Sequence, residues 1–375
     1  MPPALPTEPE HLTDAWLTEI LCGGRSAGAA SVVSHRWETI AEQGAASVVG
    51  RVSLTYDRET AGAPVSVVMK FATPHAPIRT IIHQLGLYRS EVEFYRQIGP
   101  DAGIPIPHCY HADIDTTSGY FVLAIEDMKD SRVGDPFRPA VADVEQAIDR
   151  LAPFHAKWWN SPRLREFDWL PYPGDPVYEA RSARVQQSFG AAAGAVRQKL
   201  GPQFPDVLSI ACDRILSDWR GFVQSRLAGP LTLEHRDFHA QQLFFPSERG
   251  GRFAVFDWQT VGVGPGADDL ARGIAGLPIA ERAANDERLI ARYHERLLAS
   301  GVTGYPLARC QRDFGLGLTA SLTINVVAAA TIDLSLFSKR EAESGVGLMY
   351  GLFDRLAAAF EAHGVIDLLP GRQWA

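Results

Sequence analysis

Apolar and polar positions in the first third of the chain follow the pattern of short strands. Residues 37–42, 48–56 and 65–71 are predicted strands separated by small or turn-forming residues, and the second segment alternates at every other position. Residues 119–125 are apolar throughout, which is typical of a strand buried on both faces. We therefore expect these segments to form one sheet in an N-terminal lobe.

Apolar residues recur with the helical period elsewhere in the chain. In the N-terminal lobe they predict a helix at residues 14–21, with Thr13 as its N-cap, and another at 79–98. The chain is therefore α+β, and we place the lobe boundary so that residues 1–128 and 129–375 form the two lobes. The second lobe is mostly helical, with predicted helices at residues 141–159, 182–200, 204–227, 281–300, 307–337 and 346–363.

The segment from Leu231 to Trp258 gathers polar residues around two short apolar strands. A turn at Pro246–Gly251 can close these strands into a hairpin, which would return Asp257 to the neighbourhood of Asp237 and Gln242. Two carboxylates and an amide oxygen at one point suit phosphoryl transfer, because one aspartate can orient a hydroxyl while the other groups hold magnesium on a nucleotide. An ordinary pair of strands whose polar residues cap turns explains the same sequence pattern equally well.

Lys70 stands near the end of an apolar strand, where a lysine either extends to solvent or binds an anion. Glu91 lies on neighbouring rows of a predicted helix with apolar residues, so it can face inward and pair with Lys70. Ser47 ends a run of small residues, whose backbone N–H groups can approach a phosphate closely. A hairpin turn made of small residues is the commoner explanation of that run.

Composition narrows the class of protein and its surroundings. The net charge of −8 argues against nucleic acid as a partner, although a local basic group can still hold a nucleotide. The four cysteines are scattered without zinc or redox spacing, and the N-terminus has no basic, apolar signal sequence, so we expect a cytoplasmic protein. Residues 315–332 are uncharged but contain several Ser, Thr and Asn residues, which favours a buried helix over a membrane span.

Five stretches between Gly44 and Ala271 carry a family resemblance. In order and spacing they resemble the aminoglycoside phosphotransferase and choline kinase superfamily, most closely its ecdysteroid kinase-like branch. The likeness implies a two-lobed, protein kinase-like fold, with an antiparallel sheet and one helix in the N-terminal lobe and a mostly helical C-terminal lobe. The stretches are GAASVVGRVSLTY, SVVMKF, RSEVEFYRQI, FVLAIEDM, and HRDFHAQQLFF followed by FAVFDWQTVGVGPGADDLA.

The resemblance implies roles for the polar residues of the second lobe. Asp237 would be the catalytic base, and Asp257 with Gln242 would hold Mg2+. Asp269 would brace the catalytic loop. The family usually has Gly where this chain has Arg236, and Asn where it has Gln242, so the metal contact must shift by about one bond length. Whether Arg236 pairs with Glu234 or reaches the substrate is left open by the sequence.

The resemblance also implies a nucleotide site in the N-terminal lobe. Lys70 would contact the phosphates of ATP or GTP and pair with Glu91. Ser47 and its loop would cover the phosphates. Glu126 and Met128 would present backbone groups to the purine ring.

The most specific function that the sequence supports is transfer of a γ-phosphoryl group to a hydroxyl of a small molecule. Residues beyond 271 shape the acceptor pocket in this superfamily, and here they include the uncharged segment 315–332. A polycationic aminoglycoside would require an acidic pocket and choline an aromatic cage, and neither is evident, so we expect a largely apolar alcohol or phenol. Alternatives are an antibiotic or choline kinase and, because of Gln242, a catalytically silent pseudokinase. A protein kinase is disfavoured because no activation-loop and A-P-E arrangement follows Asp257.

Overall fold

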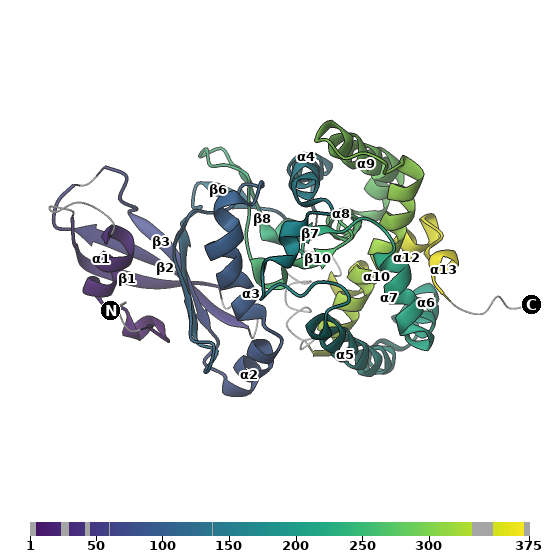
Figure 1. Ribbon diagram of the computed structural model, residues 1–375, viewed down its shortest axis with the longest axis horizontal. Helices are drawn as coiled ribbons and strands as arrows, with labels where there is room; N and C mark the ends of the chain where they lie inside the picture. The colour runs from purple at the N-terminus through teal and green to yellow at the C-terminus, as the bar shows by residue number, and fades with distance from the viewer. Residues whose placement is uncertain are drawn as a thin grey trace, which may run out of the picture. The chain divides into compact units, whose positions relative to one another are not determined.

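The computed structural model describes residues 5–23, 30–41, 46–59, 61–136, 138–331 and 348–370 (Figure 1). Gly44 and Ala45 of the small-residue run, and the end of the helix predicted at 307–337, lie outside these ranges. The described chain forms two compact units. The first contains Met1–Arg132 and Pro246–Val261, and the second contains Val133–Phe245 and Gly262–Ala375.

The first unit is built on one antiparallel sheet with the strand order β1-β2-β3-β5-β4. Its strands are β1 (Val32–Ala41), β2 (Ser47–Tyr56), β3 (Ser66–Ala72), β4 (Cys109–Ile114) and β5 (Phe121–Glu126). Helix α1 (Asp14–Cys22) packs beside the sheet, and Leu17 on the helix is buried with Val52 and Met69 on the strands. The predicted N-cap is confirmed, because the Trp16 N–H donates to Thr13 Oγ1 at 3.1 Å.

The single helix predicted at residues 79–98 is wrong. The structure has α2 (Ala76–Gln84) and then α3 (Leu87–Glu93), which continues as a π-helical turn from Phe94 to Ile98. Gly86 separates α2 from α3 because its φ of 74° lies in the left-handed region, where a helix cannot continue. The break gives α3 an axis of its own, from which Glu91 reaches the sheet.

The segment Pro246–Val261 belongs to the first unit although its neighbours in sequence belong to the second. Its strand β9 (Ala254–Val255) donates a hydrogen bond from Val255 N–H to Pro105 C=O at 2.9 Å. Trp258 then stacks on Phe94, with ring centroids 3.9 Å apart and planes 9° from parallel. The compact units therefore differ from a simple division after Met128, because this return segment packs on α3 and its π turn.

The second unit is mostly helical. Strands β7 (Thr232–Glu234) and β10 (Gly262–Gly264) pair antiparallel, and β6 (Ser131–Val133) and β8 (Leu243–Pro246) lie where the chain changes units. Its helices are α4 (Val141–Trp158), α5 (Pro176–Leu200), α6 (Asp206–Ser217), α7 (Trp219–Leu227), α8 (Ala267–Ala275), α9 (Ile279–Ala299), α10 (Leu307–Thr331), α12 (Leu348–Ala362) and α13 (Val365–Leu368).

Two of these helices differ from or clarify the sequence expectations. The helix predicted at 204–227 is interrupted at Asp218, where the backbone leaves the helical conformation. The Asp218 carboxylate then caps α7 by accepting from Gly221 N–H at 2.9 Å. Among the described helices, α10 is long and apolar enough to cross a membrane, yet 67% of its most apolar window is buried. It packs against α5, α8 and α12 (Figure 1), as an interior helix of this unit does.

The stack of Phe94 and Trp258 predicts the effect of a core truncation. Phe94→Ala should lower the free energy of unfolding of the first unit by about 3–5 kcal/mol, because it leaves a cavity beneath the indole ring. Urea unfolding of the variant measures the loss. Ile81→Ala is the control, since Ile81 is 57% exposed and should change stability by less than about 0.5 kcal/mol. Equal effects of the two variants would contradict a structural role for the stack.

Candidate functional site

The first unit holds a buried lysine between two carboxylates. Lys70 Nζ lies 2.8 Å from Glu91 Oε2 and 2.8 Å from Asp257 Oδ1, and all three side chains are at most 10% exposed. The expected Lys70–Glu91 ion pair is therefore present. Burial alone would lower the pKa of Lys70, but Asp257 and Glu91 outweigh it and hold that pKa above its ordinary value. Burial raises the pKa of Glu91, even though Lys70 opposes the shift.

Local structure around Asp257 fixes the direction of its carboxylate. Asp257 has φ 63° and ψ 60°, a left-handed conformation that is uncommon for a residue other than glycine. Trp258 follows it, fully buried, and donates from Nε1 to Val255 C=O at 3.1 Å. Gln259 Nε2 donates to Asp257 Oδ2 at 3.3 Å. Because the indole is locked, the strained turn presents Asp257 toward Lys70.

Ser47 begins β2, where its Cα pairs with that of Ala72 on β3, two residues from Lys70. Tyr88 on α3 ties this end of the sheet together. Its hydroxyl donates to Ala46 C=O at 2.5 Å and accepts from Thr73 N–H at 3.3 Å. Ser47 thus lies at the Lys70 end of β2, and its side chain is 6% exposed.

The segment after β5 is held by the side chain of Asp127. Arg51 donates from Nε to Asp127 Oδ2 at 2.6 Å and from Nη2 to Oδ1 at 3.1 Å, and Ser66 Oγ donates to Oδ2 at 2.7 Å. Glu126 N–H donates to His108 C=O at 2.8 Å, and Met128 C=O accepts from Ser131 N–H at 2.9 Å. These two backbone groups are therefore engaged within the protein.

In the second unit, the loop between β7 and β8 is braced by the fully buried Asp269 of α8. The N–H groups of His235 and Arg236 donate to Asp269 Oδ2 and Oδ1, each at 2.7 Å. His155 Nε2 lies 3.3 Å from the same carboxylate. Two charge-assisted bonds to consecutive amides fix the loop, as expected for Asp269.

This loop places Asp237 beside a cation that sequence analysis missed. Arg272 donates to Asp237 Oδ1 from Nε at 3.1 Å and from Nη2 at 2.9 Å, while His239 Nε2 lies 3.3 Å from the same oxygen. Gln242 Nε2 donates to Asp237 Oδ2 at 3.4 Å. Burial alone would raise the pKa of Asp237, but His239 and Arg272 outweigh it and hold that pKa well below its usual range. The carboxylate is therefore ionised at neutral pH.

Arg272 could have been found from its spacing. It lies three residues after Asp269 in α8, so both project from neighbouring rows of one helix toward the same loop. Asn325 on α10 accepts a further bond from Arg272 Nη1 at 2.8 Å. This partner lies 53 residues away in sequence, and no local pattern indicates it.

Arg236 answers the question that the sequence left open. Its Nε lies 3.3 Å from Glu234 Oε2, and its Nη2 donates to Val263 C=O at 2.8 Å. Its φ is 68°, which explains why glycine suits this position and makes arginine conformationally costly. The guanidinium also lines a pocket.

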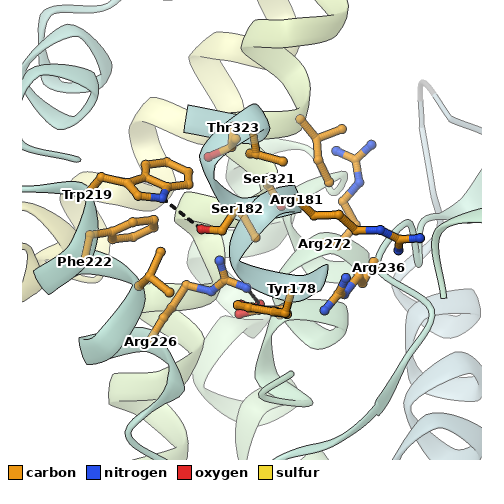
Figure 2. A pocket seen from close by; sticks show the side chains of 15 residues that line it. Tyr178, Arg181, Ser182, Trp219, Phe222, Arg226, Arg236, Arg272, Ser321 and Thr323 are labelled. Atoms are coloured by element: carbon orange, nitrogen blue, oxygen red, sulfur yellow. Dashed lines mark hydrogen bonds and ion pairs between the residues drawn. The ribbon is translucent and has the colours of Figure 1, made fainter. Parts of the chain in front are cut away.

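That pocket has a volume of about 210 Å³ and lies between α5, α7, α8 and α10 of the second unit. Figure 2 shows Trp219 and Phe222 on one side and the labelled Arg181, Arg236 and Arg272 on the other. Because Arg272 also holds Asp237, the pocket reaches the partner of the expected catalytic base.

The expected metal ligands come from both units, with Asp257 in the first and Gln242 in the second. In the described ranges, no three His, Cys, Asp or Glu side chains meet in a group that could hold a metal ion. Magnesium in kinases takes few protein ligands and completes its shell with phosphate oxygens and water. A carboxylate oxygen of Asp257 suits such a site chemically, and the convergence of Asp257 with Asp237 stays a prediction.

Comparison with known proteins identifies related sequences. A family model described as the phosphotransferase enzyme family matches residues 49–306. An uncharacterized kinase-like protein of Caenorhabditis elegans is 26% identical over 221 residues, which are 56% of this chain and 56% of that protein. The chain thus spans just over half the length of this curated relative.

Two solved structures share the fold at low sequence identity. A choline kinase of Cryptosporidium parvum matches with a TM-score of 0.56 and 11% identity, over 91% of this chain and 93% of that chain. A protein of Ralstonia eutropha, provisionally described as an aminoglycoside phosphotransferase, matches with a TM-score of 0.52 and 15% identity, over 96% and 98%. The α+β architecture with an N-terminal antiparallel sheet and a helical C-terminal part is that of a kinase-like fold.

The ion triad predicts a strongly non-additive pair of substitutions. Lys70→Met should cost about 3–5 kcal/mol of unfolding free energy, because Glu91 and Asp257 would then share a buried site without a cation. Adding Glu91→Gln should recover part of that loss, since one of the two charges disappears. Urea unfolding of the single and double variants measures the coupling. Additive losses would show that the three groups do not act together.

Proposed function

The chain belongs to the phosphotransferase enzyme family, and from this premise we propose that it transfers the γ-phosphoryl group of a nucleoside triphosphate to a hydroxyl of a small, largely apolar alcohol or phenol. The observation that carries the proposal is the buried triad of Lys70, Glu91 and Asp257. Its ammonium group is held in place by two carboxylates, and such a fixed cation suits a phosphate group.

The nucleotide is bound by groups of the first unit in this proposal. Lys70 contacts the phosphates while Glu91 keeps its side chain in position, and Ser47 at the start of β2 covers them. The C=O of Glu126 and the N–H of Met128 bind the purine of ATP or GTP, since the opposite backbone group of each residue is already bonded. Asp127, tied to Arg51 and Ser66, keeps this backbone in place.

Asp257 and Gln242 are the residues that would hold Mg2+, which supplies positive charge to the phosphates. The Asp257 carboxylate is a hard oxygen ligand, and its turn is fixed by Trp258. Gln242 lies in the η6 turn (Ala240–Gln242) and offers its amide oxygen to the metal, while its Nε2 donates to Asp237. One residue thus connects the metal site to the acceptor site.

The transfer itself requires Asp237 to orient the acceptor hydroxyl. The hydroxyl oxygen forms a bond to the γ-phosphorus, the bond from that phosphorus to the oxygen bridging the β-phosphate breaks, and the hydroxyl proton passes to Asp237. Arg272 occupies Oδ1, so Oδ2 is the oxygen placed to accept this proton. A weakly basic carboxylate suffices, because such transfer depends mainly on positioning and electrostatics.

The acceptor enters the pocket beside Arg272 in this proposal. Its aromatic and aliphatic lining favours a largely apolar body.

A catalytically silent nucleotide-binding protein is the second candidate. The observation in its favour is the contact between Gln242 and Asp237, in which the amide of Gln242 donates a hydrogen bond to the carboxylate of the expected base. Turnover with a range of hydroxylated acceptors distinguishes the two candidates.

Asp237→Asn tests the catalytic role. With magnesium-ATP and magnesium-GTP and a panel of hydroxylated small molecules, wild type should form phosphorylated products detectable by mass spectrometry. Asp237→Asn should lower kcat by about 10²–10⁴-fold, because a general base is removed, while the Kd of the nucleotide stays within about threefold. Asp354→Asn, an exposed aspartate of α12, is the matched control. Nucleotide binding without any product from wild type would favour the silent protein.

Asp257→Asn tests the metal role through binding alone. The Mg2+ concentration that half-saturates the nucleotide complex should rise by about tenfold or more, because the charged oxygen ligand is lost. Nucleotide affinity in EDTA should stay equal or increase, since the variant carries one negative charge fewer. Binding of a fluorescent nucleotide measures this magnesium dependence. If it is unchanged in the variant, Asp257 only holds Lys70 in place and does not bind the metal.

A further inference from the structure

The pocket of the second unit is lined by cationic side chains, although the whole chain has a net charge of −8. Among the described residues, four arginines line it from three helices and the loop after β7, together with one acidic residue, Asp268. Such a local excess of one charge attracts ligands of the opposite sign. The arginines are Arg181, Arg226, Arg236 and Arg272.

Acidic partners within and around the lining offset part of this charge. Arg226 Nη2 lies 2.5 Å from Asp268 Oδ2, and Arg272 is bound to Asp237. Arg236 faces Glu234, which is fully buried. Burial and the neighbouring Asp268 raise the pKa of Glu234 well above its ordinary value, which weakens it as a counter-ion. The described lining therefore carries more arginines than acidic side chains.

Buried polar atoms of the lining lack hydrogen-bond partners within the described protein. They are Arg226 Nε, Asp268 Oδ1 and Ser321 Oγ. Ser321 and Asp268 are 1% and 5% exposed. A buried polar atom without a partner costs about 1–3 kcal/mol, so these atoms support a site for a polar ligand. Two of the atoms, on Arg226 and Ser321, can donate to an oxyanion.

The opposite wall is apolar. Trp219 and Phe222 of α7 lie across the pocket from the labelled guanidinium groups of Arg181, Arg236 and Arg272 (Figure 2). The Trp219 indole is fixed by a 3.0 Å bond from Nε1 to Ser182 Oγ. A volume of about 210 Å³ suits a small body such as one ring or a short aliphatic chain.

Arg236, one of the arginines that line the pocket, has a strained backbone conformation. It keeps φ at 68°, and its guanidinium packs so closely on Gly262 that a Cβ there would lie 2.1 Å from Arg236 Cζ. A glycine at 236 would avoid the strain, so a ligand role for the arginine accounts for a residue that the backbone disfavours.

We propose that the acceptor is a hydroxy acid: a small apolar or aromatic body whose carboxylate is bound by the pocket's arginines, with Arg181 and Arg236 as the principal ligands. The inference rests on the proposed function, because it assigns the pocket to the phosphoryl acceptor. Arginine binds carboxylates through paired, charge-assisted hydrogen bonds, which fixes the orientation of the molecule as well as its charge. The hydroxyl end then faces Asp237, the partner of Arg272.

A cationic acceptor is the competing possibility, since the three rings of Tyr178, Trp219 and Phe222 could surround an ammonium group. Four guanidinium groups in the same lining oppose it. The experiment therefore includes amines as a separate arm.

Matched acceptors of one size and three charges test the proposal. The aromatic set is 4-hydroxyphenylacetate, its amide and tyramine, and the aliphatic set is 6-hydroxyhexanoate, its amide and 6-aminohexanol. Calorimetry with the full-length protein measures binding, and mass spectrometry after incubation with magnesium-ATP measures transfer. In at least one set the acid should bind about tenfold more tightly than its amide, as one charge-assisted contact provides. The amine should bind most weakly.

Variants locate the effect. Arg181→Gln and Arg236→Gly should each reduce the preference for the acid to about threefold or less, and the second should not lose stability because glycine tolerates the left-handed backbone. Arg184→Gln is the matched control, since Arg184 lies on the same helix, is exposed, and does not line the pocket. It should keep the full preference.

The outcomes separate the inference from the proposed function. Tighter binding of the acid, lost in both variants, without any phosphorylated product, would support the anion site and contradict the kinase activity. Phosphorylation of the amide or amine at least as fast as the acid would support the kinase and overturn the hydroxy acid. Absence of binding by both acids, or equal loss of the preference in Arg184→Gln, would also overturn it.

Discussion

A lysine buried among apolar side chains must meet negative charge, and this requirement organises the first unit. Lys70 satisfies it with one carboxylate from α3 and another from a segment 187 residues later in sequence. Because Asp257 must reach that ammonium, the return segment packs on the sheet unit, anchored by Trp258 on Phe94 and by a strand bond to Pro105. The same ion pairs that stabilise the fold hold one cation between two carboxylates, and the proposed binding of a metal–phosphate group depends on this charge pattern.

In the second unit a buried carboxylate, that of Asp269, organises the structure around it. Asp269 is held by backbone amides rather than by a lysine, and its two bonds determine the path of the loop that carries Asp237. Three residues further along α8, Arg272 binds the side chain of Asp237 itself. One helix therefore positions both the backbone and the carboxylate of the candidate base, so a small shift of α8 would displace both. Packing of α8 against α10 restrains such a shift.

Local sequence pattern predicted the parts of this arrangement that depend on local rules. Thr13 as a cap and Glu91 on an inward helix row follow from spacing within one turn. The break at Gly86 was missed because apolar periodicity continues through it, although the backbone does not. Asn325 was missed for a different reason. Its contact with Arg272 joins residues 53 positions apart, and the packing of α8 against α10, which no short window contains, decides such a contact.

Arg236 joins these two levels. The loop must turn through a left-handed residue because Asp269 holds both neighbouring amides, so the backbone there favours glycine whatever the side chain does. Strain of about 1–3 kcal/mol is usual for such a residue and persists where surrounding structure enforces it. Its guanidinium contacts Glu234 and also the C=O of Val263, which lies 27 residues away in sequence. Position 236 places a guanidinium in the pocket wall, on the residue that precedes Asp237 in the chain. The loop that carries Asp237 therefore contributes one of the pocket's guanidinium groups, so in our proposal the binding of the acceptor and the position of the expected base depend on the same turn.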